Sequence, residues 1–108
     1  MSGSKLEKTN IASTILENVV YTLDVVKVFR NINPDIELTS VGVFTLVSLT
    51  EGVCNSDVCE YFKIDKDKAN KHIQILKLLD LVSISNVGNL YLTEKGYGIR
   101  KQLLKILG

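Results

Sequence analysis

The spacing of apolar residues changes near residue 80, and this change restricts the folds open to the chain. Before that point apolar residues recur every three to four residues, as they do on one face of a helix. The segments LVSIS and LYLT then alternate between apolar and polar residues, with the turn-forming residues NVGN between them. Helical spacing returns after Thr93. We therefore predict a mainly α chain with a small β-hairpin, an α+β fold.

Helices are predicted on both sides of the hairpin, four before it and one after it. The first covers residues 11–32 and ends before Pro34, because proline disfavours helix in the residue that precedes it. The third is short, and the fourth covers about residues 66–79. Side chains suited to cap the second to fifth helices are Thr39, Asn55 or Ser56, Asp65 and Thr93.

The length of 108 residues fits a single domain. We expect residues 1–10 to be a flexible terminus and residues 11–108 to form the domain. The positions of the second helix that are expected to face its core are Val43, Phe44, Leu46, Val47 and Leu49.

The first and last predicted helices carry more apolar residues than one buried face requires. The first has two apolar stripes on different sides, and Ile99 and Ile106 widen the apolar face of the last. Burial from a second direction by a partner subunit is the simplest explanation. We therefore predict a homodimer with N- and C-terminal dimerisation helices, in contact through Leu16, Val20, Tyr21, Val25, Val28, Leu103, Leu104 and Leu107.

The charges are unevenly distributed along a chain whose formal net charge is only +1. Residues 1–62 hold four cations and eight acids, whereas residues 63–108 hold nine cations and four acids. Such a distribution can attract a polyanion to one face of a nearly neutral protein. The alternative is that these lysines only solvate exposed helix faces.

The fourth predicted helix combines an apolar back with a polar front. At about 100° per residue, Ala69, Ile73 and Leu76 share one side, whereas Asn70 and Gln74 point away from it. Amide side chains suit base edges, and ammonium groups suit phosphates. We therefore predict a DNA-reading face made of Lys66, Lys68, Asn70, Lys71, Gln74 and Lys77. His72 lies on the apolar side and is expected to pack near the core.

Enzymatic, metal-binding and membrane-spanning classes find little support in the sequence. No glycine-rich phosphate loop or catalytic constellation occurs, and we predict no enzyme and no cofactor. Cys54, Cys59 and the single His72 do not supply a zinc site, so reduced thiols are expected, with a redox role for Cys54 as an alternative. The polar start and the absence of a long apolar run predict a soluble, cytoplasmic protein.

The order of elements is that of a winged helix-turn-helix, and the residues that carry this pattern span about residues 37–98. They are ELTSVGVFTLVSL, then NSDVCEYFKIDKDKANKHIQILKLLDLV, then YLTEKG. On these segments the chain resembles MarR-like and related compact phage, plasmid or archaeal winged-helix regulators. The resemblance implies that helix 66–79 enters the major groove of double-stranded DNA.

The resemblance also implies a homodimeric, sequence-preferring transcription regulator, with repression as the default outcome. In this fold the β-hairpin is called the wing. The resemblance adds Asn55 and the wing residues Asn86 and Asn89 to the expected DNA contacts, although the wing tip carries no cation. Two alternatives stay open: a centromere-binding adaptor of a plasmid or phage partition system, and a winged-helix module for protein–protein interaction. The sequence does not identify an operator or an effector.

Overall fold

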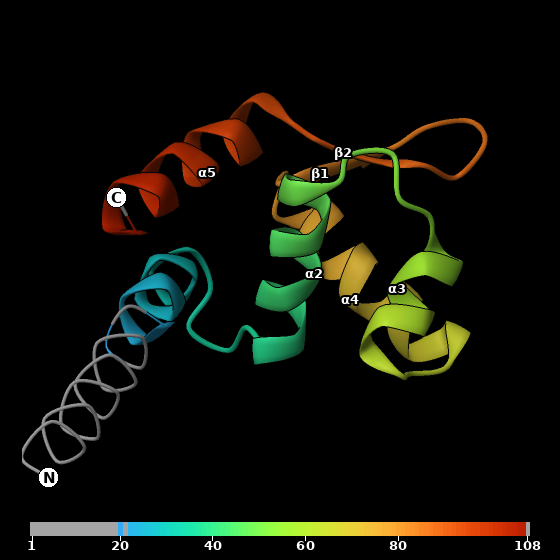
Figure 1. Ribbon diagram of the computed structural model, residues 1–108, viewed down its shortest axis with the longest axis horizontal. Helices are drawn as coiled ribbons and strands as arrows, with labels where there is room; N and C mark the ends of the chain where they lie inside the picture. The colour runs from blue at the N-terminus through green and yellow to red at the C-terminus, as the bar shows by residue number, and fades with distance from the viewer. Residues whose placement is uncertain (1–19, 21, 108) are drawn as a thin grey trace, which may run out of the picture.

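The elements follow one another in the predicted order. The computed structural model describes residue 20, residues 22–106 and the backbone of residue 107. A helix over residues 22–32 is followed by α2 (Leu38–Leu49), α3 (Asn55–Phe62), α4 (Lys66–Leu78), β1 (Val82–Ile84), β2 (Leu90–Leu92) and α5 (Glu94–Leu107). Figure 1 shows α2, α3, α4 and the hairpin grouped at one end, with helix 22–32 and α5 at the other.

The helix over residues 22–32 ends where Pro34 predicts. The N–H of Asn33 still donates to the carbonyl of Phe29, and the chain then turns away. The predicted flexible terminus and the first part of the predicted helix, residues 1–19, lie outside the described residues.

Two of the predicted helix caps are confirmed. The N–H of Lys68 donates to Asp65 Oδ1 over 2.8 Å at the start of α4. The N–H of Gly96 donates to Thr93 Oγ1 over 3.0 Å at the start of α5. The prediction for α2 is wrong, because this helix starts at Leu38, one residue before Thr39, and has no side-chain cap.

The cap of α3 also differs from the prediction, because Cys54 occupies the capping position and α3 begins at Asn55. The N–H of Cys54 donates to Asp57 Oδ2 over 2.9 Å, which forms half of a capping box. This hydrogen bond and a second one from the Cys54 thiol hold the pKa of Asp57 below its usual value. This hydrogen bond is therefore strongest at neutral pH, where Asp57 is ionised, and weakens when Asp57 is protonated in acid.

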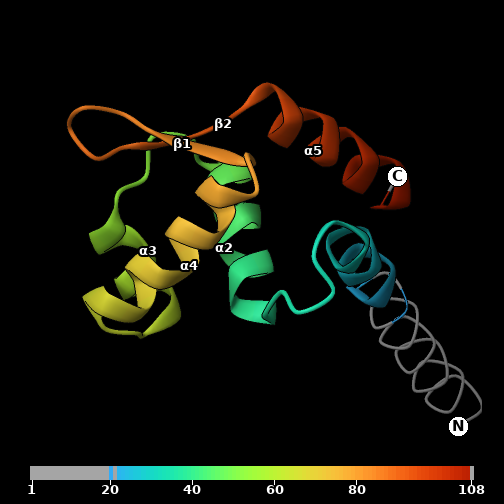
Figure 2. The same ribbon diagram turned by 180° about the vertical axis from the view of Figure 1, so that it is seen from behind.

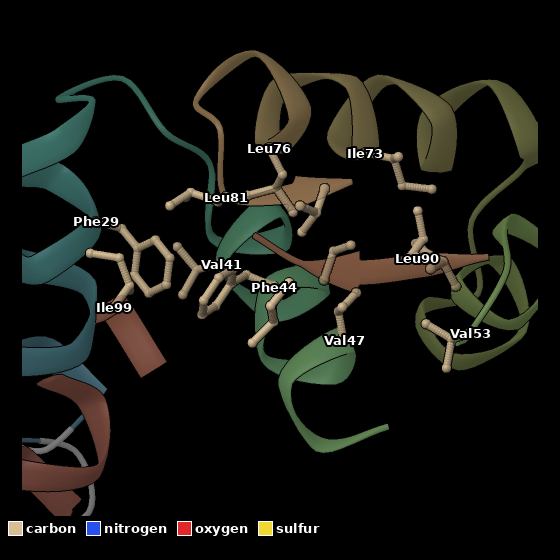
Figure 3. Close-up of a cluster of buried hydrophobic side chains, with 14 of the residues drawn as sticks. Phe29, Val41, Phe44, Val47, Val53, Ile73, Leu76, Leu81, Leu90 and Ile99 are labelled. Atoms are coloured by element: carbon tan, nitrogen blue, oxygen red, sulfur yellow. The ribbon is translucent and has the colours of Figure 1, made fainter. Parts of the chain in front are cut away.

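The core lies between α2, α4 and the hairpin and extends to helix 22–32. Phe29 and Phe44 are fully buried and pack edge to face with ring centroids 5.1 Å apart. Figure 3 shows Phe29 of helix 22–32 close to Ile99 of α5, so this aromatic pair joins the two ends of the molecule. One predicted core position of α2 is wrong: Leu49, in its last turn, is 79% exposed.

The end of α4 is fixed by hydrogen bonds of the Schellman type. The N–H of Leu81 donates to the carbonyl of Leu76 and the N–H of Asp80 to that of Lys77, each over 3.0 Å, while Asp80 takes a left-handed φ of 60°. Leu76 and Leu81 are both fully buried, which supplies the apolar contact that accompanies this motif. The chain thus turns directly from α4 into β1.

The predicted hairpin is confirmed and gains a further pairing. β1 and β2 are antiparallel, with Val82 opposite Leu92 and Ile84 opposite Leu90. On the other edge of β2, the N–H of Gly52 donates to the carbonyl of Leu90 over 2.7 Å, and the N–H of Leu90 donates to that of Val53 over 2.8 Å. The segment between α2 and α3 therefore lies along the hairpin and ties it to the helices.

The start of α5 packs tightly against the end of α4. The Thr93 hydroxyl donates to the carbonyl of Asp80, and Lys95 Nζ donates to that of Leu79 over 3.1 Å. Gly96 allows the close approach, because a Cβ built there would lie 2.2 Å from the carbonyl oxygen of Leu81. Further along α5, the Tyr97 hydroxyl donates to Glu51, which raises the pKa of Tyr97.

Replacing Gly96 with alanine is expected to destabilise the protein, because backbone and not a flexible side chain occupies the space that the new methyl group needs. We expect a loss of about 1–3 kcal/mol in the free energy of unfolding, measured by urea denaturation.

The matched control is Gly98→Ala on the same helix, where no atom lies within 4 Å of the added Cβ. This variant should gain up to about 1 kcal/mol from the higher helix propensity of alanine. Equal effects of the two variants would contradict the packing described for the start of α5.

Candidate nucleic-acid interface

The turn between α3 and α4 sets where α4 begins. Lys63 takes a left-handed φ of 56°, and the N–H of Ile64 donates to the carbonyl of Cys59 over 3.2 Å. Asp65 then caps α4. Figure 2 shows the result, with α3 and α4 next to each other and α4 in front of α2.

One side of α4 is buried and the opposite side is exposed. Ala69, Ile73 and Leu76 are at most 3% exposed. Figure 3 shows Ile73 and Leu76 directed toward the buried cluster between α4, α2 and the hairpin. The residues predicted to form the DNA-reading face are all exposed, with Asn70, Lys71 and Gln74 directed away from the buried side and three lysines flanking them: Lys66, Lys68 and Lys77. The amphipathic arrangement that the sequence predicts is therefore present, and the protein's own described residues leave this face uncovered.

A buried hydrogen bond fixes the rotation of α4 about its axis. His72 is 7% exposed, and its Nδ1 lies 2.8 Å from the hydroxyl oxygen of Ser40 on α2, which is fully buried. On the other side of the ring, Nε2 lies 3.9 Å from a carboxylate oxygen of Glu37. The three side chains have the order of a hydrolytic triad, but the complete burial of Ser40 prevents its hydroxyl from reaching a substrate. The cluster instead anchors α4 to α2.

The ammonium groups of the face are available to an external anion. The ion pairs within 4.0 Å among the described residues are Lys27–Asp24 and His72–Glu37, and neither includes a lysine of α4. Four lysines of α4 therefore carry charges that no carboxylate of the described chain neutralises: Lys66, Lys68, Lys71 and Lys77.

Asn55 is held at the junction of α3 and α4. Its Nδ2 donates to the carbonyl of Lys66 over 3.5 Å, and its Oδ1 accepts from the Cys59 thiol over 3.3 Å. Its amide therefore already has partners within the protein. Asn55 still lies at the rim of the face, where it lines a cleft with the wing.

The wing tip is a closed turn with an apolar side chain at its end. The N–H of Ser85 donates to the carbonyl of Asn89 over 2.8 Å, and the N–H of Asn89 donates to Ser85 Oγ over 3.0 Å. Asn86 is exposed and Asn89 is half-buried. Val87, which the sequence reasoning did not single out, is 80% exposed. In both views the loop extends beyond α3, away from α5.

A cleft of about 350 Å³ separates the first turns of α4 from the wing. Its floor is apolar and its rim is polar and mixed in charge. The lining residues are Asn55, Lys66, Asp67, Asn70, Ile73, Ile84, Gly88 and Leu90. The cleft adjoins the exposed face of α4, so a duplex bound to that face would also contact the wing.

Two further residues of the face were missed by the sequence reasoning. Asp67 is exposed in the first turn of α4, and Leu78 is 84% exposed in its last turn. At about 100° per residue, both lie on the centre line of the exposed side. The same angular projection that selects Asn70 and Gln74 also selects these two residues, but neither is a cation or an amide.

The predicted dimerisation residues are divided between exposed and buried positions. Val20 and Leu104 are 54% and 58% exposed, whereas Leu103 is 7% exposed and belongs to the hydrophobic core. Val25 and Val28 are partly buried against that core. Leu16, Tyr21 and the side chain of Leu107 lie outside the described residues.

Among the described residues, no helix is long and apolar enough to cross a membrane. The same part of the chain holds no group of three or more His, Cys, Asp or Glu side chains placed to bind a metal ion.

The fold is similar to that of solved MarR-type winged-helix regulators. A MarR repressor of Listeria monocytogenes matches with a TM-score of 0.74 and 19% identity, over 94% of this chain and 70% of that one. A MarR transcriptional regulator of Methanosarcina mazei matches with a TM-score of 0.66 and 22% identity, over 93% and 74%. A MarR family protein of Mycobacterium tuberculosis, crystallised in complex with DNA, matches with a TM-score of 0.62 and 13% identity, over 88% and 73%.

These matches confirm the predicted MarR-like winged-helix fold. No protein-family model matches the sequence, and no curated protein is significantly similar to it in sequence.

The Ser40–His72 bond predicts a specific loss of stability. Replacing Ser40 with alanine removes the partner of a buried ring nitrogen, and we expect the free energy of unfolding to fall by about 1–3 kcal/mol in a urea titration. Ser48→Ala is the matched control, because this partly buried hydroxyl donates to the carbonyl of Phe44 in its own helix. A Ser40 variant no less stable than the Ser48 variant would exclude the anchoring role.

Proposed function

We propose that the protein is a cytoplasmic, homodimeric, non-enzymatic regulator that binds double-stranded DNA with sequence preference. In this proposal α4 enters the major groove and the wing contacts the neighbouring backbone. The observation that carries it is the exposed, unneutralised face of α4, in which amide side chains lie between lysines. The Mycobacterium tuberculosis protein of the same fold was crystallised in complex with DNA, which supports DNA as the ligand of this fold.

The roles follow from the chemistry of each side chain. Asn70 and Gln74 suit the paired donor and acceptor of adenine, and Lys71 suits guanine or a phosphate. Lys66, Lys68 and Lys77 surround them and suit phosphates. Asn55 at the rim and Asn86 and Asn89 in the wing would contact the sugar-phosphate backbone of the DNA. The wing tip carries no cation that could enter the minor groove.

A homodimer would place two such faces on one side of a duplex. Dimerisation through helix 22–32 and α5 fits the exposed apolar side chains of Val20, Leu23 and Leu104 at that end of the molecule. Two recognition helices then reach successive major grooves about 34 Å apart on a pseudo-palindromic site. Repression by occlusion of a promoter is the simplest outcome of such binding.

The uncharged wing tip and a surface on α2 and α3 favour one other role, protein–protein interaction. A groove of about 220 Å³ is lined there by Leu46, Leu49, Tyr61 and other residues, within a stretch, residues 31–62, that contains no lysine or arginine. The two roles differ in their response to salt. Binding through phosphates weakens steeply with salt, whereas an apolar protein contact does not.

The reading face can be tested with a duplex selected in vitro from a random library. The double variant Asn70→Ala/Lys71→Ala should lose at least about 30-fold in affinity for the selected site, because each good base contact contributes at least about fivefold. Between 50 and 200 mM salt, the wild-type affinity should fall by about 10³- to 10⁵-fold if six to ten phosphates are contacted.

The control is Lys101→Ala/Gln102→Ala, which removes an adjacent lysine and amide that are exposed on α5. Affinity should stay close to that of the wild type, with an unchanged sedimentation coefficient. If the α4 double variant binds the selected site as well as this control, the assignment of α4 is wrong.

The dimer is tested by placing a charge in its proposed apolar contact. Leu104→Asp should convert the dimer to a monomer at micromolar concentration in analytical ultracentrifugation, because a carboxylate buried in an apolar interface is costly. Its circular dichroism should be unchanged, since Leu104 is 58% exposed in the protomer. Leu49→Asp, on α2, should remain dimeric. A wild-type protein that sediments as a monomer would contradict the proposal directly.

A further inference from the structure

Asp67 lies at the centre of the exposed face of α4, and the proposed contacts leave it without a role. Counting about 100° per residue, its direction lies between those of Gln74 and Lys71 and is opposite to the buried side of the helix. It is exposed in the first turn, and it lines the cleft between α4 and the wing. The first turn of a recognition helix is the part that contacts base edges in helix-turn-helix complexes.

The Asp67 carboxylate has no hydrogen-bond or ion-pair partner among the described residues. The neighbouring Asp65 accepts the N–H of Lys68, and Asp57 accepts the N–H of Cys54, so both of these acids have structural roles. Asp67 takes part in no hydrogen bond with the described part of the chain, and Lys71, one turn along the same face, is not within 4.0 Å of it. An acid anywhere in the first turn can stabilise the helix dipole, so this effect does not explain why Asp67 points to the centre of the exposed face.

A carboxylate in a major groove is repelled by the phosphates and needs a donor from a base. The amino groups of cytosine and adenine are the base donors there, and carboxylates are suited to N4 of cytosine. The guanine paired with that cytosine presents two acceptors, O6 and N7, beside the amino group. Asp67 and Lys71 are four residues apart, so their side chains are neighbours and can meet the two halves of one base pair.

We propose that Asp67 is a specificity-determining residue that accepts a hydrogen bond from N4 of a cytosine, while Lys71 donates to the guanine of the same pair. This inference rests on the proposed function and adds the base pair that the first turn of α4 selects. Each half-site should then contain one C·G pair set by Asp67 and Lys71, next to the A·T pairs suited to Asn70 and Gln74. The carboxylate also lowers affinity for every duplex that does not offer the amino group.

The test is a pair of in vitro selections from one random duplex library, with the wild type and with Asp67→Ala. The wild-type motif should contain a C·G pair that disappears from the motif of the variant, while the other positions are kept. Against a duplex in which this pair is T·A, the wild type should bind about 5- to 100-fold more weakly, and the variant within about twofold. The variant should also bind unrelated duplexes more tightly than the wild type and with a steeper dependence on salt.

Glu94→Ala is the matched control, because Glu94 is an exposed acid in the first turn of α5. It changes the charge and the helix dipole in the same way and should leave the selected motif unchanged. If Asp67→Ala keeps every base preference, or if Glu94→Ala alters the motif as Asp67→Ala does, the inference is overturned while the wild-type motif still supports the proposed function. If the wild type selects no motif at all, the proposed function itself fails, and the inference fails with it.

Discussion

The structure depends on the burial of one side of α4 against α2 and the hairpin. Ala69, Ile73 and Leu76 supply the apolar contact. The hydrogen bond between His72 and Ser40 fixes the rotation of α4 about its own axis, because apolar contacts alone allow the helix to repack at other angles. Because this side of α4 is buried, the residues on the opposite side are the ones left exposed. The lysines and amides are exposed because the helix has no other stable way to hide its apolar residues.

The connections between the helices depend on backbone conformation as much as on side-chain packing. Lys63 and Asp80 both take left-handed conformations, which non-glycine residues adopt at a cost, and they lie just after the ends of α3 and α4. The buried side chains of Leu76 and Leu81 offset that cost at the second position. The short connections so formed leave α3 and α4 little freedom relative to each other.

The sequence predicted the order of elements and the two sides of α4, because both depend on the spacing of apolar residues within one segment. It did not predict that Leu49 is exposed or that Cys54 caps α3, since these depend on where neighbouring segments end and pack. The pairing of Gly52 and Val53 with Leu90 was equally out of reach, because it joins segments almost forty residues apart. The angle of Asp67 on the helix is equally predictable from the sequence, but Asp67 is neither a cation nor an amide, the two classes of side chain expected to contact DNA.

The joint between α4 and α5 has a consequence for the proposed dimer. The carbonyls of Asp80 and Leu79 accept from Thr93 and Lys95, and Gly96 packs against Leu81, so the start of α5 is held directly against the end of α4. An extra base pair between half-sites moves one of them by about 3.4 Å and turns it by about 35° around the duplex axis. A dimer of the proposed kind that keeps this joint cannot follow such a screw displacement, and its affinity for DNA should therefore depend on the separation of the half-sites as well as on their base pairs.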